Sequence, residues 1–391
     1  MKIAILGAGI AGMSTAIALK LKGFNVSLYE RSDAPSHLGA GIVLWPNATY
    51  VLSQLDLLTE FEAVAGSPAR MQRLSSDGED LGNLDISSID QIMGYPSLSV
   101  LRRDVIKILH SRVESLGIKV NYNHDANTIT TSTDGSAVVH CLSNQTIEAD
   151  MIIGADGRTA SCARQYIQGN NKPVYQRFIN WIGICESKTD LFDDQTIADY
   201  WGQGERFGIV PINTKTAYWA GGDTAVRITP NNPRNYKQEL VQLFSTWPAI
   251  VGDTISRTKA NTIHKIYVHD HDPCERWHKN NVLMIGDAAH APLPTTGQGA
   301  CQALEDAWHV ANCLEENYHN LDHAMTIFTN LRIEKTSQII MSGRHLASSI
   351  FNRDRNENIL RNKNSQQTDF SHLAQAIARG WSEHLPLSTA Q

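Results

Sequence analysis

The chain has 391 residues, of which 42% are hydrophobic and 19% are charged, so it can bury a sizeable core and is not of low complexity. At about 150 residues per domain, this length allows two to three domains. The formal net charge of −6 argues against a protein whose main task is to coat nucleic acid or an acidic membrane.

The six cysteines form no CxxC pair, and in a chain of this length they do not resemble a disulfide framework. Reduced thiols in a cytoplasmic protein are the simplest interpretation. The apolar stretch Ile3–Leu19 is interrupted by glycines and no polar cleavage region follows it, so we do not read it as a signal peptide. We expect a soluble protein with no membrane span and no nucleic-acid partner, either a monomer or a homodimer.

The N-terminal segment predicts a βαβ unit that binds a dinucleotide. A short apolar strand (3–6) leads through Gly7-Ala8-Gly9-Ile10-Ala11-Gly12 into a helix (13–22) and a second strand (25–29). Gly7 would permit the tight turn, Gly9 the approach of a pyrophosphate, and Gly12 the packing of helix on strand. Glu30, at the end of the second strand, is placed to accept hydrogen bonds from ribose hydroxyls.

This unit alone does not distinguish NAD, NADP and FAD, because all three carry an ADP moiety. Arg31 suggests either a partner for a 2′-phosphate or a guanidinium over the adenine.

Later segments repeat the pattern of a buried strand that ends in a carboxylate. A strand in 150–157 ends at Asp156, and the strand 282–285 ends in Gly286-Asp287. Gly297-Gln298-Gly299 then opens a helix with an apolar face. Helix capping is the plain alternative for either aspartate, but their shared position after a strand and a glycine favours ligand binding.

In these segments the sequence resembles the single-component FAD-dependent aromatic hydroxylases, the group A flavoprotein monooxygenases that include para-hydroxybenzoate and salicylate hydroxylases. The matching pieces span residues 1 to about 310 in the family's order. They are GAGIAG at 7–12, Glu30-Arg31, GAGI at 39–42, the Arg102 helix, GADG at 154–157 and GDAAHAPLPTTGQGACQALEDA at 286–307.

The resemblance implies bound FAD as the cofactor, NAD(P)H as a transient co-substrate, and O2. It implies that backbone amides near the second GxG contact the flavin ring, that Pro294 lies over the ring, and that Asp156 takes part in both FAD and NAD(P)H binding. No metal is expected. The cofactor-binding residues implied are Gly7, Gly9, Ala11, Gly12, Glu30, Arg31, Gly41, Arg102, Asp156, Asp287, Pro294, Gly297, Gly299 and Ala300.

One departure concerns the residues after the Asp-Gly turn. The family's serine and arginine each fall one place late here, at Ser161 and Arg164, which puts their carry-over in doubt.

The middle of the chain predicts short antiparallel strands at 196–200, 207–212 and 217–220. In the family such a sheet roofs the flavin and selects the substrate, so side chains on these strands are pocket candidates, together with Pro294. By alternation only about half of them can face one side. The candidates are Tyr200, Trp201, Arg206, Phe207, Tyr218 and Trp219.

Two further segments give weaker signals. The histidines between 264 and 278 invite a metal reading, but a solvated polar loop is the better interpretation. Residues 352–367 are expected to form an exposed connector, and residues 369–381 a peripheral helix.

Together these features predict an α/β fold: a Rossmann-like FAD-binding domain, an inserted antiparallel-sheet substrate domain and C-terminal helices. The expected bounds are 1–70, 100–171 and 266–345 for the first, 71–99 and 172–265 for the second, and 346–391 for a helical cap.

The implied activity is hydroxylation of a small aromatic or heteroaromatic substrate through a flavin C4a-hydroperoxide. The catalytic base, if one is needed, is not identified; Tyr200, Tyr218 or a water are the candidates. The alternatives are an epoxidase or reductase of a prenyl or polyene substrate on the same fold, a plain dehydrogenase, and a non-catalytic FAD-binding scaffold.

Overall fold

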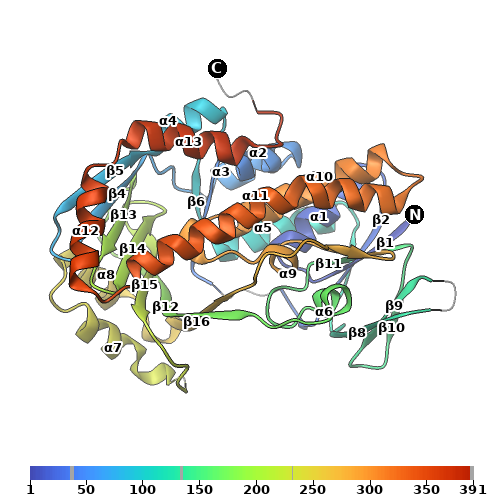
Figure 1. The fold of residues 1–391 in the computed structure, drawn as a ribbon, viewed down its shortest axis with the longest axis horizontal. Coiled ribbons are helices and arrows are strands. Elements are labelled where there is room, and N and C mark those ends of the chain that lie inside the picture. The colour runs from blue at the N-terminus through green and yellow to red at the C-terminus, as the bar shows by residue number, and fades with distance from the viewer. Residues whose placement is uncertain (36–38, 133–134, 231, 388–391) are drawn as a thin grey trace.

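The computed structural model describes residues 1–35, 39–132, 135–230 and 232–387. Two large sheets organise the molecule, and Figure 1 shows them in opposite halves. Across the described residues, no helix combines the length and the apolar character that crossing a membrane requires.

The first half is built on a six-stranded sheet. The strands β18, β11, β1, β2 and β7 run parallel, and β17 is added antiparallel at one edge. All four residues of β11 are buried, as expected for a central parallel strand. In spatial order the strands are β17 (His278–Lys279), β18 (Val282–Met284), β11 (Met151–Gly154), β1 (Lys2–Leu6), β2 (Asn25–Tyr29) and β7 (Lys119–Asn121).

Helices and two small sheets complete this half. The small sheets are β10-β9-β8 (Thr146–Glu148, Ala137–Cys141, Ala126–Thr131) and β3-β6 (Gly41–Leu44, Leu98–Leu101). The helices of this half are α1 (Ile10–Leu21), α2 (Pro46–Gln54), α3 (Leu58–Glu62), α5 (Arg102–Ser115), α6 (Cys162–Gln168), α9 (Asp287–His290) and α10 (Gly299–Glu316).

The second half is built on a seven-stranded sheet that is antiparallel except where β13 pairs with β4. Helices α7 (Tyr236–Leu243) and α8 (Ala249–Arg257) pack on one face of it. The strands in order are β16 (His264–Asp270), β12 (Val174–Glu186), β15 (Thr216–Thr224), β14 (Glu205–Pro211), β13 (Thr196–Trp201), β4 (Arg70–Ser75) and β5 (Asp80–Asp85). Short 3₁₀ turns lie at Pro233–Asn235, Ala260–Thr262 and Pro294–Thr296.

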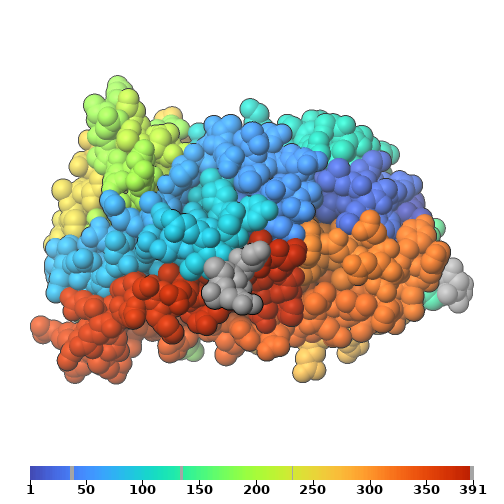
Figure 2. Space-filling model, turned by 90° about the horizontal axis from the view of Figure 1, so that it is seen from above, coloured from blue at the N-terminus to red at the C-terminus, as the bar shows by residue number. Residues whose placement is uncertain are grey.

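The helix α11 (Leu321–Ile350) runs from the first half of the molecule to the second (Figure 1) and passes uninterrupted through the boundary expected at 345/346. It is followed by α12 (Arg355–Gln366) and α13 (Phe370–Ser382), and α13 packs against α4 (Ile86–Met93). Figure 2 shows these C-terminal segments, in orange and red, lying against blue and cyan N-terminal segments.

The prediction of an exposed connector at 352–367 is therefore corrected, because most of this segment forms the helix α12. The segment lacks an apolar stripe, so its sequence resembles a loop. Its helix begins where the Asp354 carboxylate accepts from the amides of Asn356 and Glu357, and the Arg361 guanidinium ties it to the carbonyl of Gly202.

Candidate active site

The loop between β1 and α1 has the geometry that its three glycines predict. Gly7 has φ +99°, and a Cβ there would collide with the carbonyl of Ala155. A Cβ on Gly12 would collide with the carbonyl of Gly7, so helix and loop touch at this point. Gly9 faces open space and caps α1 without a side-chain hydrogen bond. The first turn of α1 therefore keeps amides free for a phosphate group.

Glu30 closes the same site from the end of β2. Its two carboxylate oxygens accept from the amides of Ala8 and Ser32, at 2.8 and 3.0 Å. Each oxygen retains a further lone pair, which suits ribose hydroxyls. Arg31 is exposed. Ala11 lies against Gly286, in the turn that follows β18.

Arg102 and Asp287 come together although 185 residues separate them. Burial lowers the pKa of Arg102, while the carboxylate of Asp287 raises it and the guanidinium of Arg158 lowers it further. The Arg102 side chain fills the space beside Gly39, whose φ is +111°. Both side chains are half-buried, and Asp287 follows the C-terminal end of the parallel strand β18, which is the edge of the sheet where a dinucleotide binds in such folds.

Asp156 is used within the protein. Its carboxylate accepts from the Ser161 hydroxyl at 2.6 Å and from the Ala163 amide at 3.2 Å, so it fixes the first turn of α6. Burial raises its pKa and the Ser161 hydrogen bond opposes that rise. Arg164 then clamps α6 to the carbonyls of Ala288 and Ala289. The late Ser161 and Arg164 thus have structural partners, and a cofactor role for Asp156 stays a prediction.

The loop from Pro294 to Gly299 lies opposite the N-terminal glycines. Pro294 is exposed at the start of a 3₁₀ turn, Gly297 has φ +63°, and α10 begins at Gly299 with Ala300 next, without a side-chain cap. The buried indole Nε1 of Trp45 and amide Nε2 of Gln298 have no partner here. Free helix amides, orphaned donors and the open space at Gly9 all fit FAD.

The two faces of the seven-stranded sheet have different partners. Phe207, Ile209 and Trp219 point into a core closed by α7 and α8. The alternate residues Val210 and Tyr218 pack toward the first half of the molecule. The face that carries Tyr218 is therefore the one that meets the loop Pro294–Gly299, the flavin loop.

This alternation corrects three pocket candidates. Tyr200 pairs with Phe207 across the strands and lies in the core under α7 and α8, so it points away from the flavin loop. Phe207 and Trp219 are excluded for the same reason, whereas Trp201 and Arg206 lie on the opposite face. The alternation of side chains along the strands divides the candidates into two faces from the sequence alone, but it does not tell which face meets the cofactor.

Arg206 is held by a carboxylate that sequence inspection missed. Asp199, buried, accepts from Arg206 Nε at 2.6 Å, from Arg206 Nη2 at 3.0 Å and from the Trp201 indole at 2.9 Å. The Nη1 group of Arg206 takes no part in this two-bond contact with Asp199. A Cβ on neighbouring Gly208 would meet nothing nearer than the Ala220 carbonyl at 4.0 Å, so open space lies over the strand beside Arg206.

Tyr218 lies at the seam between the two halves. Its ring occupies the space where a Cβ of Gly41 would be. Burial raises its pKa, with a smaller contribution from Cys301, so the phenol stays protonated at neutral pH. This makes Tyr218 a hydrogen-bond donor rather than a base.

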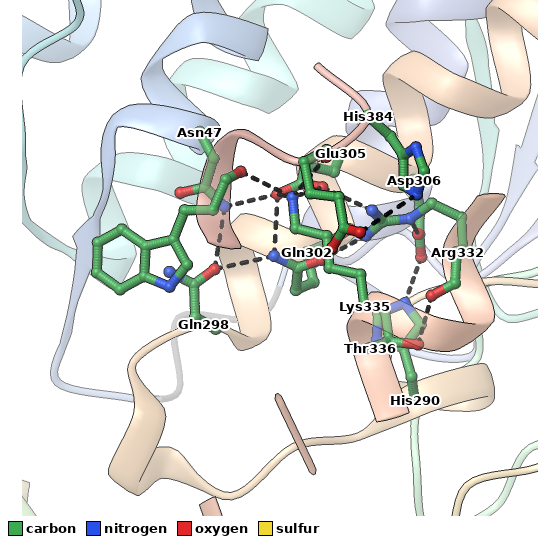
Figure 3. A network of polar contacts seen from close by, with 12 residues as sticks. Asn47, His290, Gln298, Gln302, Glu305, Asp306, Arg332, Lys335, Thr336 and His384 are labelled. Carbon is green, nitrogen blue, oxygen red and sulfur yellow. Dashed lines mark hydrogen bonds and ion pairs between the residues drawn. The ribbon is translucent and has the colours of Figure 1, made fainter. Parts of the chain in front are cut away.

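A buried charge network connects the start of α10 to α11 (Figure 3). Arg332 donates to Glu305 at 2.6 Å and to Asp306 at 2.7 Å, and Lys335 donates to Glu305 at 2.9 Å. His290 lies 2.6 Å from Asp306. The sequence signal for this network is the adjacent Glu305-Asp306 pair within the helix, which the motif at 286–307 contains without giving it a role.

Two of the histidines between 264 and 278 contact backbone carbonyls. His269 Nδ1 contacts the Tyr267 carbonyl at 2.7 Å, and His271 Nε2 contacts the Arg158 carbonyl at 2.7 Å.

A family model described as FAD binding domain matches residues 1–323. The aurachin C monooxygenase/isomerase of Stigmatella aurantiaca is 30% identical over 347 residues, which cover 87% of each protein. The FAD-dependent urate hydroxylase of Mycolicibacterium vanbaalenii is 27% identical over 350 residues, 88% of this chain and 87% of that protein. The structure of Klebsiella pneumoniae HpxO complexed with FAD and uric acid has the same fold, with a TM-score of 0.89, 22% identity and coverage of 98% and 97%.

Proposed function

The chain belongs to the FAD binding domain family, among the group A flavoprotein monooxygenases, and on that premise we propose that it hydroxylates a small, flat heteroaromatic substrate with NAD(P)H and O2. One observation carries the substrate class. On the sheet face that meets the flavin loop, Gly208 has open space beside it, and by strand register it follows Arg206 by two residues and lies diagonally opposite Tyr218. Urate, the substrate named for one relative, is a small flat heterocycle with several hydrogen-bond acceptors.

FAD would be held by the Gly7–Gly12 loop, Glu30, the Arg102–Asp287 pair and the N-terminus of α10. When bound, FAD supplies the oxygen activation and accepts hydride from NAD(P)H. The chain's own residues then position the substrate. Arg206 donates to a substrate oxygen, and Tyr218, kept protonated by burial, donates from the other side. The sheet and the long helix α11 keep bulk water away from the space between them.

The substrate role of Arg206 predicts a selective defect in Arg206→Lys. Lysine keeps a positive charge beside Asp199 but cannot form the bidentate fork, so we expect the KM for the substrate to rise by about tenfold, as expected for the loss of about 1.4 kcal/mol of hydrogen bonding. The FAD content should not change. The measurement is NAD(P)H oxidation by the FAD-loaded protein with a panel of phenols, aminoaromatics, N-heteroaromatics and polyenes, with product masses followed in parallel.

Arg70→Lys is the matched control, because Arg70 forms an exposed ion pair with Asp193 on the same sheet. A product one oxygen atom heavier from a heteroaromatic compound supports the proposal. Stimulation by polyenes alone would replace it with the epoxidase alternative. Stimulated turnover with equal KM in Arg206→Lys and wild type would remove Arg206 from the substrate site.

A further inference from the structure

Three buried polar atoms near the start of α10 have no hydrogen-bond partner in the part of the chain that the structure describes. They are the indole Nε1 of Trp45, the amide oxygen Oδ1 of Asn47 and the amide Nε2 of Gln298. Their residues are 4%, 0% and 1% exposed. Buried polar atoms are normally paired, so three orphans at one place point to a missing ligand.

The three atoms belong to one small region. Asn47 Nδ2 donates to Gln298 Oε1 at 3.0 Å, and the Trp45 indole nitrogen would lie 3.0 Å from a Cβ on Gly297. Gly297 and Gln298 are the residues that precede α10, in the loop assigned above to the flavin.

The direction of each amide is dictated by charged groups deeper in the protein. Arg332 can only donate, and its Nη2 is 2.6 Å from Gln302 Oε1, so the amide nitrogen of Gln302 must face the other way. That nitrogen donates to Gln298 Oε1 at 2.9 Å. The oxygen of Gln298 is thereby occupied, and its NH2 group is the end left unpaired.

The carboxylate Glu305 fixes Asn47 in the same way. Glu305 Oε1 accepts from Asn47 Nδ2 at 2.6 Å, which leaves Asn47 Oδ1 without a donor. Burial works to raise the pKa of Glu305, but Lys335 and Arg332 hold it below its usual value, so Glu305 is an obligate acceptor at neutral pH. Figure 3 shows Gln298 and Asn47 at one edge of this network and the charges behind them.

We propose that the Gln298 carboxamide donates a hydrogen bond to the pyrimidine ring of bound FAD, and that the Glu305–Arg332–Lys335 network fixes the amide in that direction. The unpaired set contains two donors and one acceptor. The pyrimidine edge of a flavin carries two carbonyl acceptors on either side of one N–H donor, so the set and the edge are chemically complementary. The inference rests on the FAD binding within the proposed function, and not on the identity of the substrate.

This contact stabilises the reduced flavin. Negative charge develops on the pyrimidine ring when the flavin is reduced, and a buried, preoriented donor favours that charge at no cost of reorganisation. The amide would thus add to the effect of the α10 N-terminus beside it.

The test is Gln298→Met, which keeps the length of the side chain and removes the donor. We expect the ratio of reduced to oxidised flavin at a fixed potential to fall about tenfold, which is about 30 mV for a two-electron couple. We also expect one flavin carbonyl stretch to move to higher frequency in the infrared difference spectrum of the FAD-loaded protein. Gln165→Met, at an exposed position of α6, is the control and should change neither.

Both readouts are made on FAD-loaded protein without substrate, so they do not depend on the hydroxylation. An unchanged potential and an unchanged carbonyl band in Gln298→Met would overturn the proposal, even if no substrate were ever found. If Gln298→Met fails to fold, Gln298→Asn withdraws the same donor by one methylene and keeps the amide. The same two shifts are then expected, and their absence overturns the proposal equally.

Discussion

At the scale of single residues, burial decides which charges the fold tolerates. Asp306 lies buried between His290 and Arg332, and although burial opposes it, these two partners hold its pKa below the usual value. Asp90 in α4 pairs with no cation among the described residues: its carboxylate accepts from the amide and hydroxyl of Ser97, and burial raises its pKa to about 6. The first carboxylate stabilises its network, whereas the second weakens the fold at neutral pH.

Asp90 gives a prediction about the pH dependence of stability. Its pKa of about 6 in the folded chain exceeds the usual aspartate value of 3.8, so between these values the folded state holds a proton that the unfolded state has lost. The free energy of unfolding therefore falls as pH rises through this window. In Asp90→Asn the amide oxygen can still accept from the Ser97 amide and the NH2 group can donate to the Ser97 hydroxyl oxygen, while the ionisable group behind that fall is removed. It should stabilise the protein at pH 8 by about 2 kcal/mol, and have little effect at pH 4.

Urea unfolding of FAD-saturated protein at the two pH values checks this. Asp194→Asn, at an exposed position, is the control. An equal effect of Asp90→Asn at both pH values would contradict the assigned cause.

Local chemistry at the residue scale was readable from the sequence. The tight turn at Gly7 and the close packing at Gly12 follow from contacts within one βαβ unit and appear in the structure, whereas the approach of a pyrophosphate at Gly9 stays a prediction. The partner of Arg206 was not readable, because Asp199 is one carboxylate among forty acidic residues until the register of β13 and β14 is known.

At the scale of elements, α1 combines two glycines with opposite requirements. Gly12 is in contact with the β1 loop and has no room for a side chain, whereas Gly9 has open space on the side where a phosphate would approach. One glycine serves the packing of the helix and the other serves the ligand.

Substitution by alanine should separate these requirements. Gly12→Ala forces α1 off the loop and should destabilise the chain by about 3 kcal/mol, with or without FAD. Gly9→Ala should leave the stability of the FAD-free chain within about 0.5 kcal/mol and weaken FAD binding roughly tenfold. Thermal melts of FAD-free protein and titration of FAD fluorescence measure the two quantities. If both variants lost stability equally, the assigned division of roles would be wrong.

Elements with a clear apolar period were predictable, and those without one were not. The strands β1, β2 and β13 appear close to their expected bounds, and the helix α5 begins at Arg102, where a helix was expected. The helix α12 was missed because its residues are mostly polar and its position depends on contacts with distant segments. The face of the large sheet that meets the cofactor was likewise set by what packs on it, and not by the strand pattern itself.

At the scale of the whole molecule, the buried network joins the flavin loop to the C-terminus. Lys335 contacts Glu305 on α10 and also donates to the carbonyls of Trp381 and Glu383, at 2.7 and 3.0 Å. The Trp381 ring lies 4.9 Å from that of Trp45, beside the loop. The end of α13 is therefore part of the support of the active site, and not the peripheral helix expected from its sequence.

Lys335→Met should show this coupling. It removes the donor that the two C-terminal carbonyls share and one cation from Glu305, so we expect a loss of about 3 kcal/mol or more in unfolding free energy. Proteolysis of the segment after α12 should be faster in native conditions. Lys363→Met, at an exposed position of α12, is the control. A melting temperature equal to that of the control would refute the coupling.

The length of α11 has a mechanical consequence. At 30 residues it is a rod of about 45 Å, pinned through Arg332 near the flavin loop, through Arg344 to Asp270 at the edge of the large sheet, and through Ile350 against Trp201 on that sheet. Because α11 is attached at three points along its length, we expect it to resist a hinge rotation between the two halves. We therefore expect any opening for substrate and product to come from short surface segments, and not from a rotation of one large sheet against the other.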